Sequence, residues 1–118
     1  MQKKEARLKG EREFKRVQAS GRAVYSPILM IKFLANNSEH SRFGIIVSNK
    51  VSKKATLRNL IKRKIREILR LAQKKIKKGF DVVVIVSPRI VNAQGKIPRY
   101  QEIGNVLLAT LAKGDLIL

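Results

Sequence analysis

The sequence predicts a single α+β domain whose elements follow the order helix, strand, strand, helix, strand, helix. Apolar residues recur at steps of mostly three and four from Leu57 to Ile76, which indicates one face of a helix. Runs rich in β-branched residues lie on either side of it, at 43–48 and 80–86, and indicate strands. A strand, a helix and a strand in this order favour a parallel pair joined by a right-handed crossover. The 118 residues suffice for one core, so we treat 1–118 as one domain.

The amino-terminal part predicts a short helix after a polar start. Residues 1–9 are polar and are expected to be frayed. Residues 10–21 predict a helix whose modest apolar side includes Phe14 and Val17. Gly21 stands where a glycine commonly ends a helix.

A run of β-forming residues follows. Residues 23–34 predict one strand. Pro27 has no N–H group, so we expect it at the start of that strand or on a sheet edge. Residues 36–41 are a polar turn, and we therefore expect strands 23–34 and 43–48 to form a hairpin.

The second half of the chain is expected to hold two helices and one strand. Thr56 is the expected N-cap of the basic helix, which should end near Gly79. Residues 80–86 then predict a strand buried on both faces. Pro98 opens a last helix over 99–113. We expect the helices to cover one face of the sheet and to leave the other face, or a cleft beside it, free for a partner.

The charge balance indicates a polyanionic partner. Lys and Arg number 27 against 8 Asp and Glu, so the formal net charge is +19. Such a chain repels itself unless an anion binds it, and nucleic acid is favoured over an acidic membrane surface or an acidic protein. The absence of cysteine fits a cytoplasmic setting. We find no signal peptide and no apolar run near the ~20 residues that span a bilayer.

The basic charge is concentrated at 50–78, which holds thirteen Lys or Arg and one acid, Glu67. At 100° per residue, the polar side chains on the face opposite the apolar one are Asn59, Arg63, Arg66, Arg70, Lys74 and Lys77. A solvated helix face is the alternative interpretation. We favour a polyanion-binding surface, because the face carries almost no acids to pair with its bases and a basic loop at 50–54 extends it.

The sequence offers few candidates for catalysis. His40 lies in a polar turn, and we favour a solvated loop residue over a general base or a metal ligand. Asp81 opens a buried strand and is either a site residue or, as we favour, a residue that caps the preceding turn. The other acids are scattered, and no glycine-rich phosphate loop is present. If the chain belongs to an enzyme, its partner carries the catalytic groups.

Aromatic residues bear on single-strand binding. Phe14, Tyr25 and Phe33 lie on the first predicted helix and strand, where a base of single-stranded RNA could stack on them. The alternative, which we favour for each taken alone, is a place in the core.

The bases of the helix stand in the pattern Arg58-Asn59-x-x-Lys62-Arg63-x-x-Arg66, and with them the chain resembles the protein subunit of bacterial ribonuclease P. The resemblance covers about residues 7–112. Its further parts are the stretches 7–22, 43–50 and 80–88. Two positions depart from the family pattern: Leu60 replaces a third basic residue, and Gln18 replaces a second aromatic.

The resemblance implies an α-β-β-β-α-β-α sandwich like the second domain of ribosomal protein S5, with one strand more than the residues alone predict. It also implies a left-handed β-α-β crossover around the basic helix. The implied function is 5′ maturation of precursor transfer RNA. In that reaction the RNA subunit, with Mg²⁺, performs the hydrolysis, and the protein is a subunit without catalytic residues or a metal site of its own.

By this resemblance the protein binds ribonuclease P RNA and the 5′ leader of precursor tRNA, with no membrane and no small-molecule substrate. The residues expected to bind the catalytic RNA are Lys50, Lys53, Lys54, Arg58, Asn59, Lys62, Arg63, Arg66 and Arg70. The residues expected to line a leader-binding cleft are Phe14, Tyr25, Lys32 and Ser48. The alternative function is that of a ribosomal or general RNA-binding protein. A membrane-surface or acidic-protein binder is disfavoured, since the core needs the apolar face of the helix.

Overall fold

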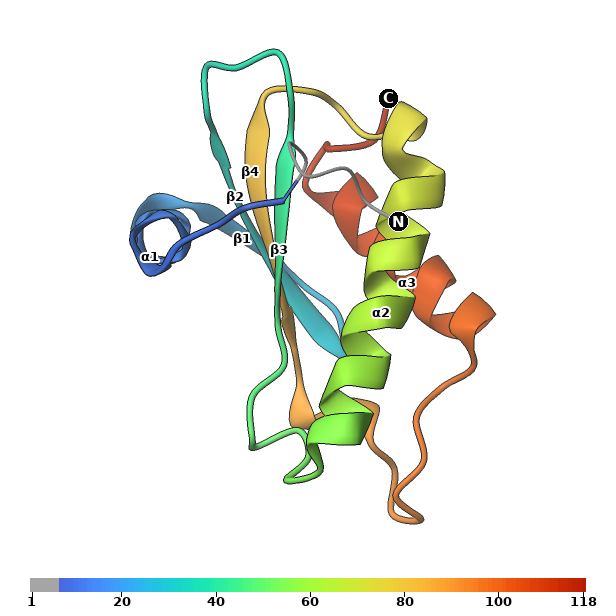
Figure 1. The fold of residues 1–118 in the computed structure, drawn as a ribbon. Coiled ribbons are helices and arrows are strands. Elements are labelled where there is room, and N and C mark those ends of the chain that lie inside the picture. Colours follow the sequence, from blue (N-terminus) through green and yellow to red (C-terminus); the bar gives the residue numbers. More distant parts are fainter. Residues whose placement is uncertain (1–6) are drawn as a thin grey trace.

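The computed structural model describes residues 7–118 and contains three α-helices and four strands in that range (Figure 1). Their order, α-β-β-β-α-β-α, is the one that the family resemblance implies. The elements are α1 (Glu11–Ser20), β1 (Arg22–Tyr25), β2 (Leu29–Ala35), β3 (Arg42–Ile46), α2 (Ala55–Ala72), β4 (Phe80–Val86) and α3 (Tyr100–Lys113). Two short 3₁₀ turns, η2 (Gln73–Lys75) and η3 (Pro88–Ile90), follow α2 and β4.

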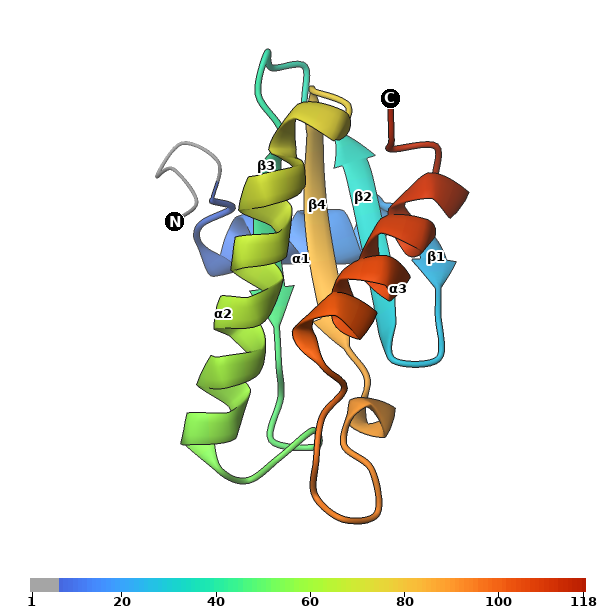
Figure 2. The same ribbon diagram turned by 90° about the vertical axis from the view of Figure 1, so that its right-hand side faces the viewer.

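The four strands form one mixed sheet in the order β1-β2-β4-β3. The strand β4 pairs antiparallel with β2 and parallel with β3. Figure 2 shows β3 and β4 both running downwards behind α2, with β4 to the right of β3, so the β3-α2-β4 crossover is left-handed. The left-handed connection implied by the resemblance is confirmed, and the right-handed expectation is wrong. A right-handed crossover would place α2 on the face that α1 occupies.

Two strand predictions need correction. The predicted strand 23–34 is in fact the hairpin of β1 and β2. Its turn is fixed by Ser26, whose N–H donates to Leu29 O at 2.8 Å and whose Oγ accepts from Leu29 N at 3.1 Å. Pro27 lies exposed in this turn. The expected hairpin with β3 does not form, because β4 lies between β2 and β3.

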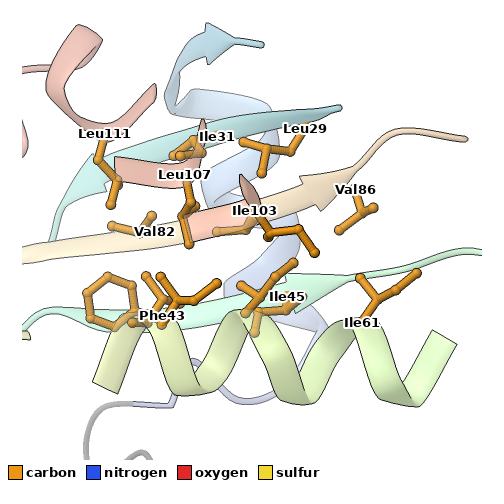
Figure 3. Packing of buried hydrophobic residues seen from close by; sticks show 14 of the residues in the cluster. Leu29, Ile31, Phe43, Ile45, Ile61, Val82, Val86, Ile103, Leu107 and Leu111 are labelled. Atoms are coloured by element: carbon orange, nitrogen blue, oxygen red, sulfur yellow. The ribbon is translucent and has the colours of Figure 1, made fainter. Parts of the chain in front are cut away.

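The helices α2 and α3 cover one face of the sheet and bury the main core (Figures 1 and 3). Alternate residues of the central strands point toward them, including Ile31 of β2 and Val82 of β4. On the opposite face α1 covers a smaller cluster of Leu8, Val17 and Val83. The prediction that 80–86 is buried on both faces is therefore confirmed.

The ends of the helices differ in detail from the sequence predictions. Gly21 follows α1 with a φ of −77°, outside the left-handed region, and a Cβ atom there would lie 3.0 Å from Phe33 O. Lys54, not Thr56, occupies the N-cap of α2, and no side chain caps it. The helix α2 ends at Ala72 and continues as η2, short of the predicted Gly79.

The amino-terminal strap, which we define as residues 7–9, is only partly as expected. Arg7 forms a parallel bridge with Phe43, and Leu8 N donates to Phe43 O at 2.9 Å. The strap thus lies along the outer edge of β3, so the expectation of fraying is wrong for Arg7 and Leu8. The part of that expectation that concerns residues 1–6 lies outside the described residues.

Candidate nucleic-acid interface

The helix α2 presents its basic side chains on the side away from the core. Ile61, Ile65 and Leu69 are almost fully buried beneath it. Asn59 and Arg63 are exposed on the far side, as the 100° spacing predicts. Lys50, Lys53 and Lys54 are exposed in the loop that leads into the helix. We call the nine residues of this loop and helix that were predicted to bind the catalytic RNA the basic surface.

Two arginines of the basic surface hold partners within the protein. Arg58 Nη1 donates to Ser52 O at 2.9 Å and so fastens the basic loop to the first turn of α2. Arg70 donates to both carboxylate oxygens of Glu67, at 2.5 and 3.1 Å. This pair lowers the pKa of Glu67 and raises that of Arg70, mainly through the side-chain hydrogen bond between them. The hydrogen-bond donors of Arg58 and Arg70 are therefore partly engaged before any partner binds.

The remaining cations of the basic surface are open to a partner. Lys53, Lys62 and Arg63 form no ion pair with the acids of residues 7–118. Guanidinium groups bind phosphates in a forked, two-point manner, while ammonium groups act as point charges. Such a row of unpaired cations along the basic loop and α2 suits a phosphate backbone.

A second candidate surface lies on the other side of the sheet, around α1 (Figure 1). Phe14 is half-buried there and its ring lies against Gly44 of β3, since a Cβ atom on Gly44 would stand 2.5 Å from Phe14 Cε1. Lys32 points to the same face, and its Nζ donates to Gln18 O at 3.0 Å. Lys32 is thus attached to the last turn of α1.

A hollow of about 370 Å³ opens at the carboxyl ends of β3 and β4. It brings together Tyr25, Ser48 and Lys50, of which Tyr25 is 62% exposed. Phe14 and Lys32, also predicted for the cleft, do not line the hollow. The four predicted cleft residues therefore fall into two groups, Phe14 and Lys32 on the α1 face and Tyr25 and Ser48 at the hollow. Lys50 belongs to both the hollow and the basic loop.

Several residues that line the hollow were not named individually among the predicted cleft residues, although Met30 lies within the strand stretch 25–32 that the resemblance assigns to the cleft. Met30 and Ile85 are half-buried and form part of its wall, and Arg89 contributes a further cation from η3. The period-2 alternation of β2 could have indicated Met30, because it points away from the buried Leu29 and Ile31. Arg89 follows the end of β4 in sequence, and no local pattern distinguishes it.

The buried carboxylate of Asp81 fastens α1 to the sheet. Its side chain is 0% exposed and accepts hydrogen bonds from Arg42 Nε at 2.8 Å, Arg42 Nη2 at 2.7 Å and Asn36 Nδ2 at 2.9 Å. Arg16 of α1 donates to the same carboxylate. Burial by itself would raise the pKa of Asp81, but the hydrogen bonds from Arg42 and Asn36 and the charges of both arginines lower it. Asp81 is thus an anchor rather than the turn cap that we favoured.

The described residues contain no group of three or more His, Asp or Glu side chains placed to hold a metal ion. His40 is exposed and donates its backbone N–H to Ser38 Oγ at 3.2 Å. Within residues 7–118 no helix is long and apolar enough to cross a membrane.

The two departures from the family pattern have different surroundings. Gln18 is exposed on α1, so no aromatic platform stands one turn after Phe14. Leu60 is half-buried and, unlike Leu57, is not among the side chains of the described chain that pack against the main core.

Known proteins resemble this chain in sequence and in fold. Residues 1–106 match the family model described as ribonuclease P. The chain is 47% identical to the ribonuclease P protein component of a Synechocystis strain over 87 residues, which are 73% of this chain and 70% of that protein. It is 37% identical to the component of a Pseudanabaena strain, over 94% of this chain and 92% of the other. The solved structure of the RNase P protein from Thermotoga maritima superposes with a TM-score of 0.82 at 33% identity, covering 91% of this chain and 96% of that one. The chain belongs to the family of bacterial ribonuclease P protein components.

Proposed function

We propose that this protein binds ribonuclease P RNA and the 5′ leader of precursor tRNA, and so assists the endonucleolytic 5′ maturation of tRNA in the cytoplasm. One observation carries the proposal: two surfaces suited to RNA lie on different sides of one sheet and share Lys50. The unpaired cations of α2 lie on one side. Phe14 lies on the other, and the hollow lined by Tyr25 and Ser48 opens at the carboxyl ends of β3 and β4. A two-sided protein can hold a catalytic RNA and a single-stranded segment of substrate together.

The two surfaces differ in the chemistry that they offer. The basic surface offers mainly cations, which neutralise phosphates without reading bases. The α1 side offers an aromatic ring and apolar strand residues, on which unpaired bases can stack, with Lys32, Lys50 and Arg89 nearby for phosphates. We therefore assign the folded RNA to α2 and the single-stranded leader to the α1 side.

The hydrolysis is assigned to the RNA subunit with Mg²⁺. Carboxylates are the protein ligands that Mg²⁺ favours, and the described residues do not gather them into a site. Asp81, the one fully buried carboxylate among residues 7–118, is saturated by donors from three residues. We therefore propose that the RNA binds the ion, and we assign no step of the reaction to this chain's acids.

A general or ribosomal RNA-binding protein is the alternative function, and a binding competition separates the two. The affinity of the purified protein would be measured for a bacterial ribonuclease P RNA and for a ribosomal RNA fragment of equal length, at the same salt and Mg²⁺ concentrations. The proposal predicts a clear preference for ribonuclease P RNA. Equal affinities, with equal salt dependence, would favour the alternative.

A further inference from the structure

The side chains on the α1 face of the sheet form three rows that run across the strands. Residues that lie opposite one another in the register of neighbouring strands point to the same face. The first row begins with a charged pair, the second row is mostly small, and the third row is apolar. Taken from β3 towards β1, the rows are Arg42, Asp81 and Leu34; Gly44, Val83, Lys32 and Ala23; and Ile46, Ile85, Met30 and Tyr25.

The helix α1 packs on the second row through apolar contacts. Phe14 lies against Gly44, and Val17 packs in one cluster with Val83. Apolar contacts have no preferred direction, so they do not by themselves fix where α1 lies along the sheet. The apolar third row offers α1 contacts of the same kind.

The third row nevertheless remains partly open. Met30 and Ile85 are half-buried and line the hollow, and Tyr25 is 62% exposed. Apolar side chains that lie together on a surface are typical of a binding site, whereas single ones are not. An interaction that holds α1 away from this row would therefore preserve the row for a partner.

Directional bonds tie α1 to the first row. Arg16 of α1 donates to Asp81 of β4, and Arg42 of β3 donates to Glu13 of α1 at 3.2 Å. Arg16 and Glu13 also pair with each other, at 3.4 Å. The planar geometry of guanidinium and carboxylate groups restricts where the partners can lie. Since Asp81 is fully buried, a movement of α1 that removed Arg16 would leave a buried charge with fewer donors, which is unfavourable.

We propose that Glu13, Arg16 and Arg42 are positioning residues, which hold α1 over the first two rows and so keep the third row open for the unpaired bases of the leader. They act on the leader through the place of α1 and do not contact it. The use of the third row by the leader rests on the proposed function. The tie between α1 and the first row does not, because it follows from the bonds within the protein.

Arg16→Met tests the tie with little other damage. It removes the link from α1 to Asp81, while Asp81 keeps its bonds to Arg42 and Asn36, so the buried charge stays paired. Arg16→Lys keeps a cation at this place and is expected to behave more like the wild type.

Two further variants complete the set. Glu13→Gln weakens the link to Arg42 and replaces Arg16→Met if that variant does not fold. Lys15→Ala breaks an exposed ion pair with Glu11 on the same helix and is the matched control.

The first measurement uses the free full chain. A neutral, water-soluble gadolinium chelate is added, and the broadening of the methyl resonances of Ile46 and Ile85 is followed by NMR. In Arg16→Met, or in Glu13→Gln, this broadening is expected to decrease, because α1 moves over the third row; in Lys15→Ala it stays as in the wild type. Unchanged broadening would show that the tie does not position α1. Increased broadening would show that the tie only keeps α1 attached, and would overturn the proposal as well.

The second measurement uses the holoenzyme reconstituted with ribonuclease P RNA. The affinity for precursor tRNA is compared with that for leaderless tRNA. Arg16→Met is expected to lose roughly tenfold of the wild-type preference for precursor tRNA, comparable with the loss of one stacked base, and to leave leaderless tRNA unaffected. Ile103→Val mildly destabilises the main core and should keep the preference.

A preference that Arg16→Met retains, or that Ile103→Val loses equally, would overturn the proposal. If the wild-type holoenzyme itself shows no preference for precursor tRNA, the proposed function fails. The accessibility of Ile46 and Ile85 in the free chain then still decides whether the ion pairs hold α1 away from the third row.

Discussion

The ring of Phe14 lies so close to Gly44 that a Cβ atom on Gly44 would come within 2.5 Å of Phe14 Cε1. The residue type at position 44 of β3 therefore sets how closely α1 approaches the sheet. The close approach matters for function, because Phe14 stands on the face proposed to hold the leader.

Gly44→Ala is expected to push Phe14 outward and to destabilise the protein by about 1–3 kcal/mol, as overpacking commonly does. Urea unfolding measures the loss. Gly104→Ala is the matched control, since its Cβ atom would lie 3.8 Å from Ile68, an ordinary contact, and the change within α3 should be neutral or stabilising. Equal stability of the wild type and Gly44→Ala would show that Phe14 does not depend on this contact.

Phe14→Ala is expected to weaken the binding of precursor tRNA by the holoenzyme and to leave leaderless tRNA unaffected. Stacking of a base on an aromatic side chain contributes about 1–3 kcal/mol. Phe14→Leu serves as the comparison, because it keeps most of the apolar volume over Gly44 and removes the flat ring. An equal loss on both RNAs would assign Phe14 to the core alone.

Asp81→Asn is expected to lower the free energy of unfolding by about 3 kcal/mol, because it removes one partner of a buried charge network. Asp115→Asn, which breaks an exposed ion pair with Lys77, should change it little. Since the pKa of Asp81 is lowered in the folded state, its stabilisation is complete above the ordinary Asp value of about 3.9 and decreases as the pH falls below that value. Unfolding curves at a series of acid pH values should show this decrease in the wild type and a weaker one in Asp81→Asn. If stability decreased equally with falling pH in the wild type and in Asp81→Asn, the role of Asp81 as an anchor would be contradicted.

Arg63→Ala is expected to weaken the binding of ribonuclease P RNA and to reduce the log–log salt slope by roughly 0.7–0.9, the value for one phosphate. Arg63 is exposed and has no ion-pair partner among the described residues, so its charge is available to RNA. Arg12→Ala removes another exposed charge, on α1, and should leave the slope unchanged. Equal salt slopes for Arg63→Ala and Arg12→Ala would indicate that the RNA is attracted by the net charge of the protein instead of by a defined surface.

The elements with strong local patterns were predictable from the sequence. The strand β4 was predicted with its observed bounds because its β-branched run has few alternatives. The core and solvent sides of α2 followed from its spacing. The break between β1 and β2 was missed, because the turn depends on hydrogen bonds of Ser26 that a run of β-formers conceals. The insertion of β4 between β2 and β3 is a non-local pairing, which no local pattern contains.

The candidate site also contains residues whose position was predictable from the sequence and residues whose position was not. The exposure of Asn59 and Arg63 follows from helical spacing. The pairing of Arg70 with Glu67 was overlooked, although their spacing of three permits it. The contact of Phe14 with Gly44 joins segments far apart in the chain, so only the folded structure reveals it.

The most direct test of the proposed function is reconstitution of cleavage. The purified protein is mixed with a bacterial ribonuclease P RNA at a low Mg²⁺ concentration, and the cleavage rate of precursor tRNA is compared with that of the RNA alone. The two-surface arrangement predicts a large increase in the rate with the wild type, a smaller one with Arg63→Ala, and an increase with Phe14→Ala that is reduced for substrates with a leader. No increase with the wild-type protein would contradict the account.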